Sequence, residues 1–303
     1  MRGLTVSLLA GIGMLNACGG GGGGGGGGNP TPPPLAVNQP PVAAAKLSGE
    51  AVLNAPTVFD TTGTIDADGT ITTQSWAYGD GQTGSSNSHV YAATGNFTAT
   101  LTVTDNNGAS KSAAVAVSVA KCSGDGTRAS GLSPFLTLCT QTSRGELVFE
   151  VYPARAPITV ANFLRYVDDG FYKGLLFHRV IANFVIQAGG YTSGPVAKPP
   201  TYAPIVLESN NGLKNWRYTL AMARTAVPDS GTSQFYINLK DNPELDYNAG
   251  IAGANGYAVF GQVISGTALI DALGTVATQS LPAVGLSDVP VQDLVITSVV
   301  RMP

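Results

Sequence analysis

The stretch from Phe177 to Gly190 is the part of the sequence best equipped for chemistry, because it sets one arginine and one glutamine among apolar strand formers. Residues two apart lie on the same face of a strand, so Arg179 and Gln187 would share a side in an extended run. A short bend between them would turn a guanidinium, an amide and the apolar side chains of Phe184 and Val185 toward one groove. This combination can recognise a polypeptide, and it contains no acid/base pair.

Taken alone, these polar residues leave two interpretations open. A strand arginine such as Arg179 is usually a solvated surface residue, and so is a glutamine such as Gln187. The alternative is that both residues line a binding site. The sequence around them favours this second interpretation.

Six ordered blocks of sequence carry a resemblance to a known family. Phe177–Ile181 and Phe184–Gly190 resemble the signature of the cyclophilin-type peptidyl-prolyl isomerases, and the bacterial branch of that family fits best. The further blocks are Glu208–Asn215, Thr219–Thr225, Ser233–Asn238 and Tyr257–Val263. The resemblance runs from about Leu136 to Val300 and implies an isomerase domain over residues 136–303.

The resemblance implies an enzyme that rotates the peptide bond before a proline, whose barrier of about 18–20 kcal/mol comes from amide resonance. It assigns catalytic roles to Arg179, Gln187 and Phe184. It implies substrate contacts by His178, Val185, Ala223, Arg224, Gln234, Phe235, Tyr236, Leu245 and Tyr257. We expect His178 to pack against its neighbours or orient them, because bond rotation needs no base. The expected partners are proline-containing polypeptides, and no cofactor or metal is expected.

Several positions depart from the commonest pattern of the family. Val185 stands where methionine is usual, Tyr236 where phenylalanine is usual, and Arg224 where asparagine is frequent. Glu244 lies near the place of an aromatic residue, and Tyr257 replaces a histidine of many eukaryotic relatives, although bacterial members often carry tyrosine there. We expect turnover to survive and sensitivity to cyclosporin-type ligands to fall, chiefly because of Glu244.

Strands and two helices are expected to position this site. A strand is predicted over Gly145–Tyr152, and a helix that opens at Pro157 and ends at Gly170 is predicted from apolar residues at Val160, Phe163, Leu164 and Val167. A second helix is predicted over Thr267–Leu273, with Gly274 as its end. The resemblance implies a mostly β fold, with a closed antiparallel barrel capped by these two helices.

The first residues follow the order basic, apolar, small that is typical of a secretory signal. The apolar run from Leu4 to Leu15 is too short to span a bilayer as a helix. Cys18 directly follows Leu-Asn-Ala and resembles the cleavage site of bacterial lipoproteins, which implies a signal peptide over residues 1–17 and a lipid on Cys18. A plain signal peptide that is cleaved nearby is the alternative.

Residues 18–37 are expected to form a tether. A glycine run that ends at Gly28 is a flexible coil, and the prolines from Pro30 to Pro34 form a stiffer spacer. We expect an exported protein that is lipid-anchored in the cell envelope, in the outer membrane and facing the periplasm.

The composition fits an exported protein with two folded domains. The chain has 303 residues with 44% hydrophobic content, which suffices for two cores. Without Arg2, the 16 basic residues become 15 against 19 acidic ones, so nucleic-acid binding is not favoured.

Residues 38–120 read as a small antiparallel sandwich. Alternating runs such as Phe97–Thr104 indicate strands, and turn residues separate them. The segments Asp66–Ile71, Trp76–Gly81 and Leu101–Asn106 resemble the PKD domain, an immunoglobulin-like module of exported bacterial proteins. The partner of such a domain is not predicted.

Three features of this region resemble parts of nucleotide-binding or metal-binding sites. Gly79, Gly81 and Gly84 match a dinucleotide-binding fingerprint, but no helix follows, so we interpret them as hairpin glycines. Asp66-x-Asp68-Gly69 resembles the start of a calcium loop, yet the position that should hold glutamate is Ala77. His89 lacks a nearby second ligand, so a structural hydrogen bond is favoured over a metal site.

Residues 121–135 are predicted to be a turn-rich linker with Cys122 and Cys139 at its edges. In an oxidising compartment the two cysteines would pair and restrict the hinge between the domains. Two free thiols are the alternative.

Two further function classes remain open. A binding or chaperone module would hold proline peptides without turnover, and a surface adhesion protein would act through the sandwich. The presence of Arg179 and Gln187 favours the enzyme.

Overall fold

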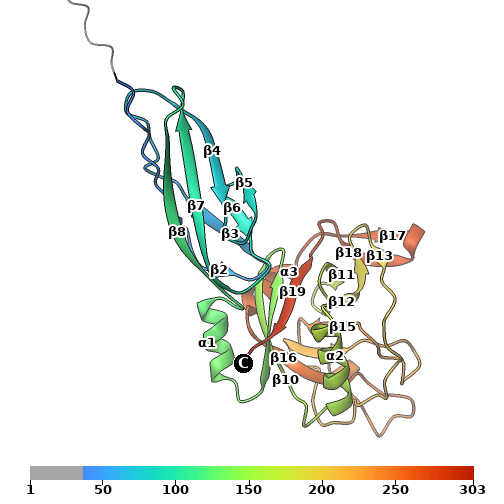
Figure 1. The fold of residues 1–303 in the computed structure, drawn as a ribbon. Coiled ribbons are helices and arrows are strands. Elements are labelled where there is room, and N and C mark those ends of the chain that lie inside the picture. The colour runs from blue at the N-terminus through green and yellow to red at the C-terminus, as the bar shows by residue number, and fades with distance from the viewer. Residues whose placement is uncertain (1–36) are drawn as a thin grey trace, which may run out of the picture. The chain divides into compact units, whose positions relative to one another are not determined.

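The computed structural model describes residues 37–303, which contain a β-sandwich followed by a β-barrel (Figure 1). The predicted signal peptide, the lipid on Cys18 and all but the last residue of the predicted tether lie outside the described residues. Among residues 37–303, no helix is both long enough and apolar enough to cross a membrane.

Two sheets make up the sandwich. The three-stranded sheet has the order β1-β3-β6, from Lys46–Leu47, Pro56–Asp60 and Ser88–Val90. The five-stranded sheet has the order β2-β8-β7-β4-β5, from Ala51–Val52, Ser110–Ala120, Gly95–Asp105, Ile71–Ala77 and Thr83–Gly84. β2 pairs with β8 in parallel and the other pairs are antiparallel. Figure 1 shows β7 and β8 side by side as the long strands of this domain.

Alternating side chains fill the sandwich core. In β7 the apolar residues Ala99, Leu101 and Val103 are fully buried, while the threonines between them face outward. Rings from both sheets meet in this core, because the centroids of Phe59 and Trp76 lie 4.5 Å apart. The predicted period-two pattern therefore builds a shared core.

His89 holds a structural hydrogen bond, as the sequence predicts. Its Nε2 lies 2.7 Å from Oδ2 of Asp80, and its ring stacks on Tyr78 at 4.0 Å. Burial would raise the pKa of the Asp80 carboxyl, but hydrogen bonds from His89 and from the backbone N–H of Gln82 outweigh burial and lower it. The pair links the turn after β4 to β6.

Of the three glycines that match a nucleotide fingerprint, Gly79 and Gly81 lie in the turn between β4 and β5, and Gly84 ends β5. Gly79 and Gly81 have φ angles of 87° and 88°, which favour glycine. A Cβ on Gly79 would lie 2.5 Å from the carbonyl oxygen of Thr98, so the neighbouring strand also requires glycine there. The hairpin interpretation is confirmed.

The barrel is one antiparallel sheet that nearly closes. Its order is β11-β12-β15-β14-β16-β10-β9-β19, from Leu175–Ile181, Val185–Thr192, Phe235–Asn238, Thr219–Met222, Val259–Ser265, Gly145–Val151, Leu136–Thr142 and Ile296–Arg301. A bridge between Leu176 and Val295 joins β11 to the chain that enters β19. This architecture confirms the predicted mostly β fold with an antiparallel barrel.

Shorter strands and helical turns accompany the main strands of the barrel. The strand β13 (Val196–Ala197) pairs with β12, and β17 (Thr278–Leu281) pairs with β18 (Leu286–Pro290) as a separate hairpin. Two single turns of 3-10 helix are η1 (Pro243–Leu245) and η2 (Pro282–Val284).

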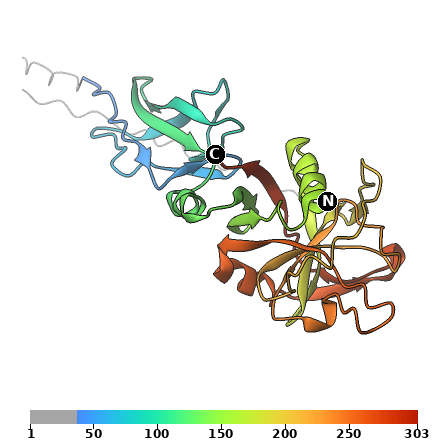
Figure 2. The same ribbon diagram turned by 90° about the horizontal axis from the view of Figure 1, so that it is seen from below.

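The two predicted helices are present as α2 (Pro157–Asp168) and α3 (Thr267–Leu273), and Figure 2 shows the yellow-green α2 beside the barrel strands. Pro157 opens α2, and Gly170, with φ of 65°, follows its end. The sequence analysis missed the residue that caps α2. The carboxylate of Glu208 accepts hydrogen bonds from the backbone N–H groups of Ile158 and Thr159 at 3.1 and 2.8 Å.

The predicted turn-rich linker is wrong in one respect, because it contains the helix α1 (Gly124–Leu132). Glycines disfavour a helix, but Ser123 caps this one by accepting from the N–H of Gly126 at 3.0 Å. Ser123 Oγ in turn donates to Glu146 on β10 at 2.6 Å. A Cβ on Gly126 would lie 2.2 Å from that carboxylate, so close packing requires this glycine. Tertiary contacts thus override the local propensity.

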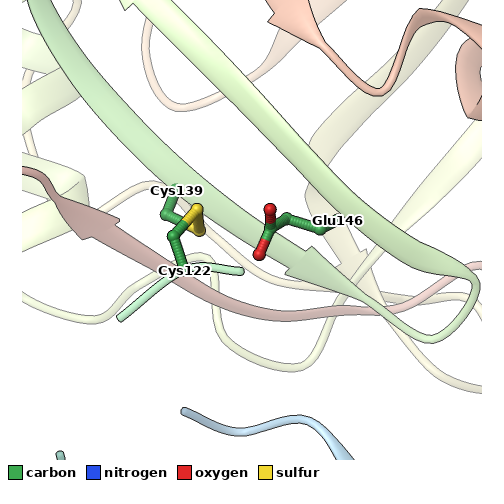
Figure 3. Close-up of side chains that lie close together, drawn as sticks. All are labelled: Cys122, Cys139 and Glu146. Carbon is green, nitrogen blue, oxygen red and sulfur yellow. A yellow bond between two sulfur atoms is a disulfide. The ribbon is translucent and has the colours of Figure 1, made fainter. Parts of the chain in front are cut away.

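Cys122 and Cys139 form a disulfide, with Cα atoms 5.8 Å apart (Figure 3). The bond joins Cys122, which precedes the cap residue of α1, to β9, and both cysteines are buried in a small cluster with Val148. Oxygens of Glu146 lie within 4.8 Å of these sulfurs. Paired sulfurs offer no thiolates, so this acid and disulfide are not a metal site.

We predict that the disulfide contributes about 3 kcal/mol to the free energy of unfolding, because it closes a loop with a sequence separation of 17 residues. Chemical denaturation of the parent and of the Cys122→Ser/Cys139→Ser variant measures this difference. A reductant should leave the double-serine variant unchanged, which is the control. Equal unfolding midpoints for the parent and the variant would contradict the prediction.

Candidate active site

The hairpin of β11 and β12 positions the two polar residues that the sequence singled out. Asn183 sits in its turn with a φ of 55°, a conformation that asparagine tolerates well. Arg179 and Gln187 are direct partners across the two strands. The predicted bend therefore brings the guanidinium and the amide onto neighbouring strands of one sheet.

Arg179 is half-buried, and its partner is a residue that sequence reasoning missed. Its Nε lies 3.7 Å from Oδ2 of Asp288 on β18, and 39% and 40% of the two side chains are exposed. Asp288 has a φ of 57°, in the left-handed region that aspartate, like asparagine, tolerates better than most residues. The contact holds one edge of the guanidinium near β18.

Gln187 and Gln234 form the polar wall of the site. Gln187 Nε2 donates to Oε1 of Gln234 at 2.8 Å, and the backbone N–H of Ala223 donates to the carbonyl of Gln234 at 3.0 Å. A Cβ on Gly190 would lie 2.5 Å from the Gln234 amide, so glycine makes room for this side chain. A small cavity of about 140 Å³ lies here, lined by Gln187, Ala223, Arg224, Thr225, Ser230, Thr232 and Gln234.

An apolar cluster adjoins this wall, and we call it the proline pocket. Its buried members are Val185, Ala221, Tyr236 and Val259, and its half-exposed members are Phe184, Leu213, Ala223, Leu245 and Tyr257. The register pairs Gln187 with Tyr236 on β15, which ties the cluster to the polar residues. Phe184, to which the resemblance assigns a catalytic role, lies here together with Val185, Tyr236 and Leu245, for which it implies substrate contacts.

Arg224 and Glu244 differ in their contacts and in their exposure to solvent. The guanidinium of Arg224 donates from Nε and Nη2 to the carbonyl of Gly256 at 2.9 and 2.8 Å, and it lies 4.5 Å from the ring centroid of Tyr257. Glu244 is exposed and pairs with Lys240 at 3.7 Å. Arg224 is therefore fixed at the rim, while Glu244 presents its charge to solvent.

Two residues predicted to contact substrate are almost fully buried. His178 is 3% exposed, and burial lowers its pKa to about 4. Phe235 is 1% exposed and packs in the barrel core against Phe163, with ring centroids 5.3 Å apart. Along β15 side chains alternate between faces, so Phe235 faces the barrel core and its neighbour Tyr236 faces the apolar cluster. The ring of His178 lies 4.6 Å from that of Tyr191, measured between centroids. The burial of His178 fits the packing role expected for it, and the substrate contacts of His178 and Phe235 stay predictions.

The fold and site define a nearly closed antiparallel barrel in which Arg179 and Gln187 pair across two strands and Gln187 pairs with Tyr236 of an apolar cluster. The chain belongs to the family of cyclophilin type peptidyl-prolyl cis-trans isomerases, whose model matches residues 135–301. The PKD domain model matches residues 38–119.

Two relatives, from Streptomyces antibioticus and Escherichia coli, support this membership. Peptidyl-prolyl cis-trans isomerase cyp18 of Streptomyces antibioticus is 49% identical over 162 residues, which cover 54% of this chain and 96% of the relative. Peptidyl-prolyl cis-trans isomerase B of Escherichia coli is 45% identical over 159 residues, covering 52% and 94%. A crystal structure of a cyclophilin type isomerase of Cryptosporidium parvum, obtained with the dipeptide Ala-Pro, is 26% identical with a TM-score of 0.47, covering 55% of this chain and 99% of that one.

Proposed function

We propose that the protein is a peptidyl-prolyl cis-trans isomerase that assists the folding of exported proteins by rotating X-Pro bonds. The observation that carries the proposal is the pairing of Arg179 with Gln187 beside the proline pocket. The relatives that share the barrel bear the name of this activity. Proline-containing polypeptides are the proposed substrates.

The geometry suits catalysis by stabilisation of a twisted amide. In that state the lone pair localises on the proline nitrogen, and Arg179 can donate toward it. Gln187 can hold the substrate carbonyl while the pocket holds the ring. A 100,000-fold acceleration requires roughly 7 kcal/mol of differential stabilisation, of which a desolvated arginine can supply a large share. No proton leaves the substrate.

An isomerisation assay on the purified protein with an Ala-Pro peptide tests the proposal. We expect turnover above the uncatalysed rate, together with saturable peptide binding. Binding without turnover would instead support the alternative of a proline-peptide binding module.

We further propose that the protein is exported and anchored in the cell envelope by a lipid on Cys18. The sequence order before Cys18 supports this proposal, and the Cys122–Cys139 disulfide fits an oxidising compartment. Labelling cells with a radioactive fatty acid tests it. Label on the parent that persists in a Cys18→Ser variant would refute lipidation at this residue.

Weak inhibition by cyclosporin-type ligands is expected, because exposed Glu244 brings a charge to the rim of the pocket. Replacing it with an aromatic residue should strengthen binding. We predict that Glu244→Trp raises the affinity about tenfold, equivalent to about 1.4 kcal/mol, as an aromatic anchor would. Titration of activity with the inhibitor measures this, and Glu244→Ala separates loss of charge from gain of a ring. Parent inhibition equal to that of eukaryotic relatives would contradict the expectation.

A further inference from the structure

Three buried asparagines lie behind the proline pocket. Asn215, Asn238 and Asn242 are each no more than 1% exposed. They come from separate segments, because Asn215 precedes β14, Asn238 ends β15 and Asn242 precedes η1. Buried amides are costly unless they are hydrogen-bonded, so their partners indicate what the cluster does.

Two of the asparagines, Asn215 and Asn242, form hydrogen bonds to three residues of the pocket. Tyr236 Oη donates to Oδ1 of Asn215 at 2.8 Å, and Nδ2 of Asn215 donates to the carbonyl of Leu245 at 3.0 Å. On the other side, Nδ2 of Asn242 donates to the carbonyl of Phe184 at 3.0 Å. Each of these three pocket residues is therefore held from behind by a buried amide.

Bonds among the asparagines join these contacts into one network. Nδ2 of Asn242 donates to Oδ1 of Asn238 at 2.7 Å, and Nδ2 of Asn238 donates to Oγ1 of Thr219 at 2.9 Å and to Oδ1 of Asn215 at 3.3 Å. The backbone N–H of Asn242 donates to the carbonyl of Asn215 at 2.8 Å. A shift at one wall would be transmitted to the others, because the bonds are continuous and buried.

The hydroxyl of Tyr236 explains why tyrosine fits where phenylalanine is usual. Burial raises the pKa of this phenol well above its ordinary range, so it stays protonated and remains a donor. Its bond to Asn215 directs the hydroxyl to the network behind the pocket. Tyrosine at this position, where the family usually has phenylalanine, thus adds a hydrogen bond to Asn215.

We propose that Asn215 and Asn242 are positioning residues that fix the width of the proline pocket by holding Tyr236, Leu245 and Phe184. The inference rests on the proposed isomerase function. It assigns the two asparagines no contact with substrate, so their effect passes through the three pocket residues.

Steady-state kinetics and peptide dissociation constants test this role with an Ala-Pro peptide. Asn215→Ala leaves the Tyr236 hydroxyl without its acceptor and leaves the Leu245 carbonyl with the backbone N–H of Tyr257 as its remaining donor. We expect KM to rise about tenfold while kcat falls by no more than about threefold. Asn242→Ala should act in the same direction through Phe184. KM changes more than kcat because the pocket loosens while Arg179 and Gln187 keep their positions.

A double-mutant cycle separates positioning from general destabilisation. In a Tyr236→Phe background, Asn215→Ala should raise KM only about threefold, because one of its two bonds to the pocket is already missing. Val160→Ala, a buried change in α2 outside the pocket, is the control for lost stability.

Two results would overturn the proposal. One is an unchanged KM in both asparagine variants, and the other is an equal rise of KM in Val160→Ala. Peptide binding keeps this test apart from the proposed function. An inactive parent would contradict the isomerase, whereas weaker peptide binding by the asparagine variants would still support the positioning role.

Discussion

Replacing Arg179 with alanine is expected to lower kcat/KM for proline isomerisation about a hundredfold or more. Arg179 pairs with Gln187 across the β11–β12 hairpin, is 39% exposed and is not part of the barrel core, so its truncation removes a donor without opening a buried cavity. Loss of one well-aimed donor to a transition state typically costs about 100- to 1,000-fold in kcat. A protease-coupled assay with an Ala-Pro peptide measures the effect.

Two variants make this experiment specific. Arg179→Lys keeps the charge but loses the planar fork, so it should recover only part of the activity. Arg128→Ala removes an exposed arginine from α1, whose nearest acid is Asp125 at 3.5 Å, and should leave kcat/KM unchanged. Activity of Arg179→Ala within about threefold of the parent would contradict the assigned mechanism.

The buried imidazole of His178 is expected to make the barrel sensitive to acid. Burial lowers its pKa from 6.5 to about 4, so between these values the unfolded chain binds a proton that the folded protein does not. The stability from neutral His178 is complete above pH 6.5 and decreases as the pH falls toward 4. The shift corresponds to roughly 3 kcal/mol.

Unfolding curves at several pH values test this expectation. Between pH 6.5 and pH 4, the free energy of unfolding of His178→Gln should fall by about 3 kcal/mol less than that of the parent. Carboxylates titrate in both proteins and cancel in the comparison. Parallel curves would rule out His178 as the source. The kcat/KM of the folded fraction should stay flat over this range, because the mechanism transfers no proton.

Much of the fold could be predicted from local patterns. Pro157 and Gly170 mark the ends of α2 because proline suits the first turn and glycine adopts a positive φ after the last. The bend at Asn183 follows from the same kind of local preference. The helix α1 could not be predicted this way, because the contacts of Ser123 and Gly126 with Glu146 come from a strand further along the chain.

The chemistry of the candidate site could be predicted from the sequence, but the contacts that hold its residues in place were less predictable. Strand alternation could not place His178, because the pairing of β11 with β12 shifts register between Phe177 and Arg179. No such signal marks Asp288, since its hairpin reaches Arg179 only through the tertiary fold. The same holds for Asn215, which meets Asn238 and Asn242 only in the folded barrel, whereas Asn238 and Asn242 lie close together along the chain.

The burial of the bond between Cys122 and Cys139 sets an order of events during maturation. Solvent reaches almost none of either sulfur in the finished protein, so an oxidant has to reach them while this part of the chain is still open. Oxidation therefore accompanies the docking of α1 and does not follow it. Once the domain has closed, the same burial protects the bond, and thiols in the surroundings can exchange with it only in molecules that transiently open.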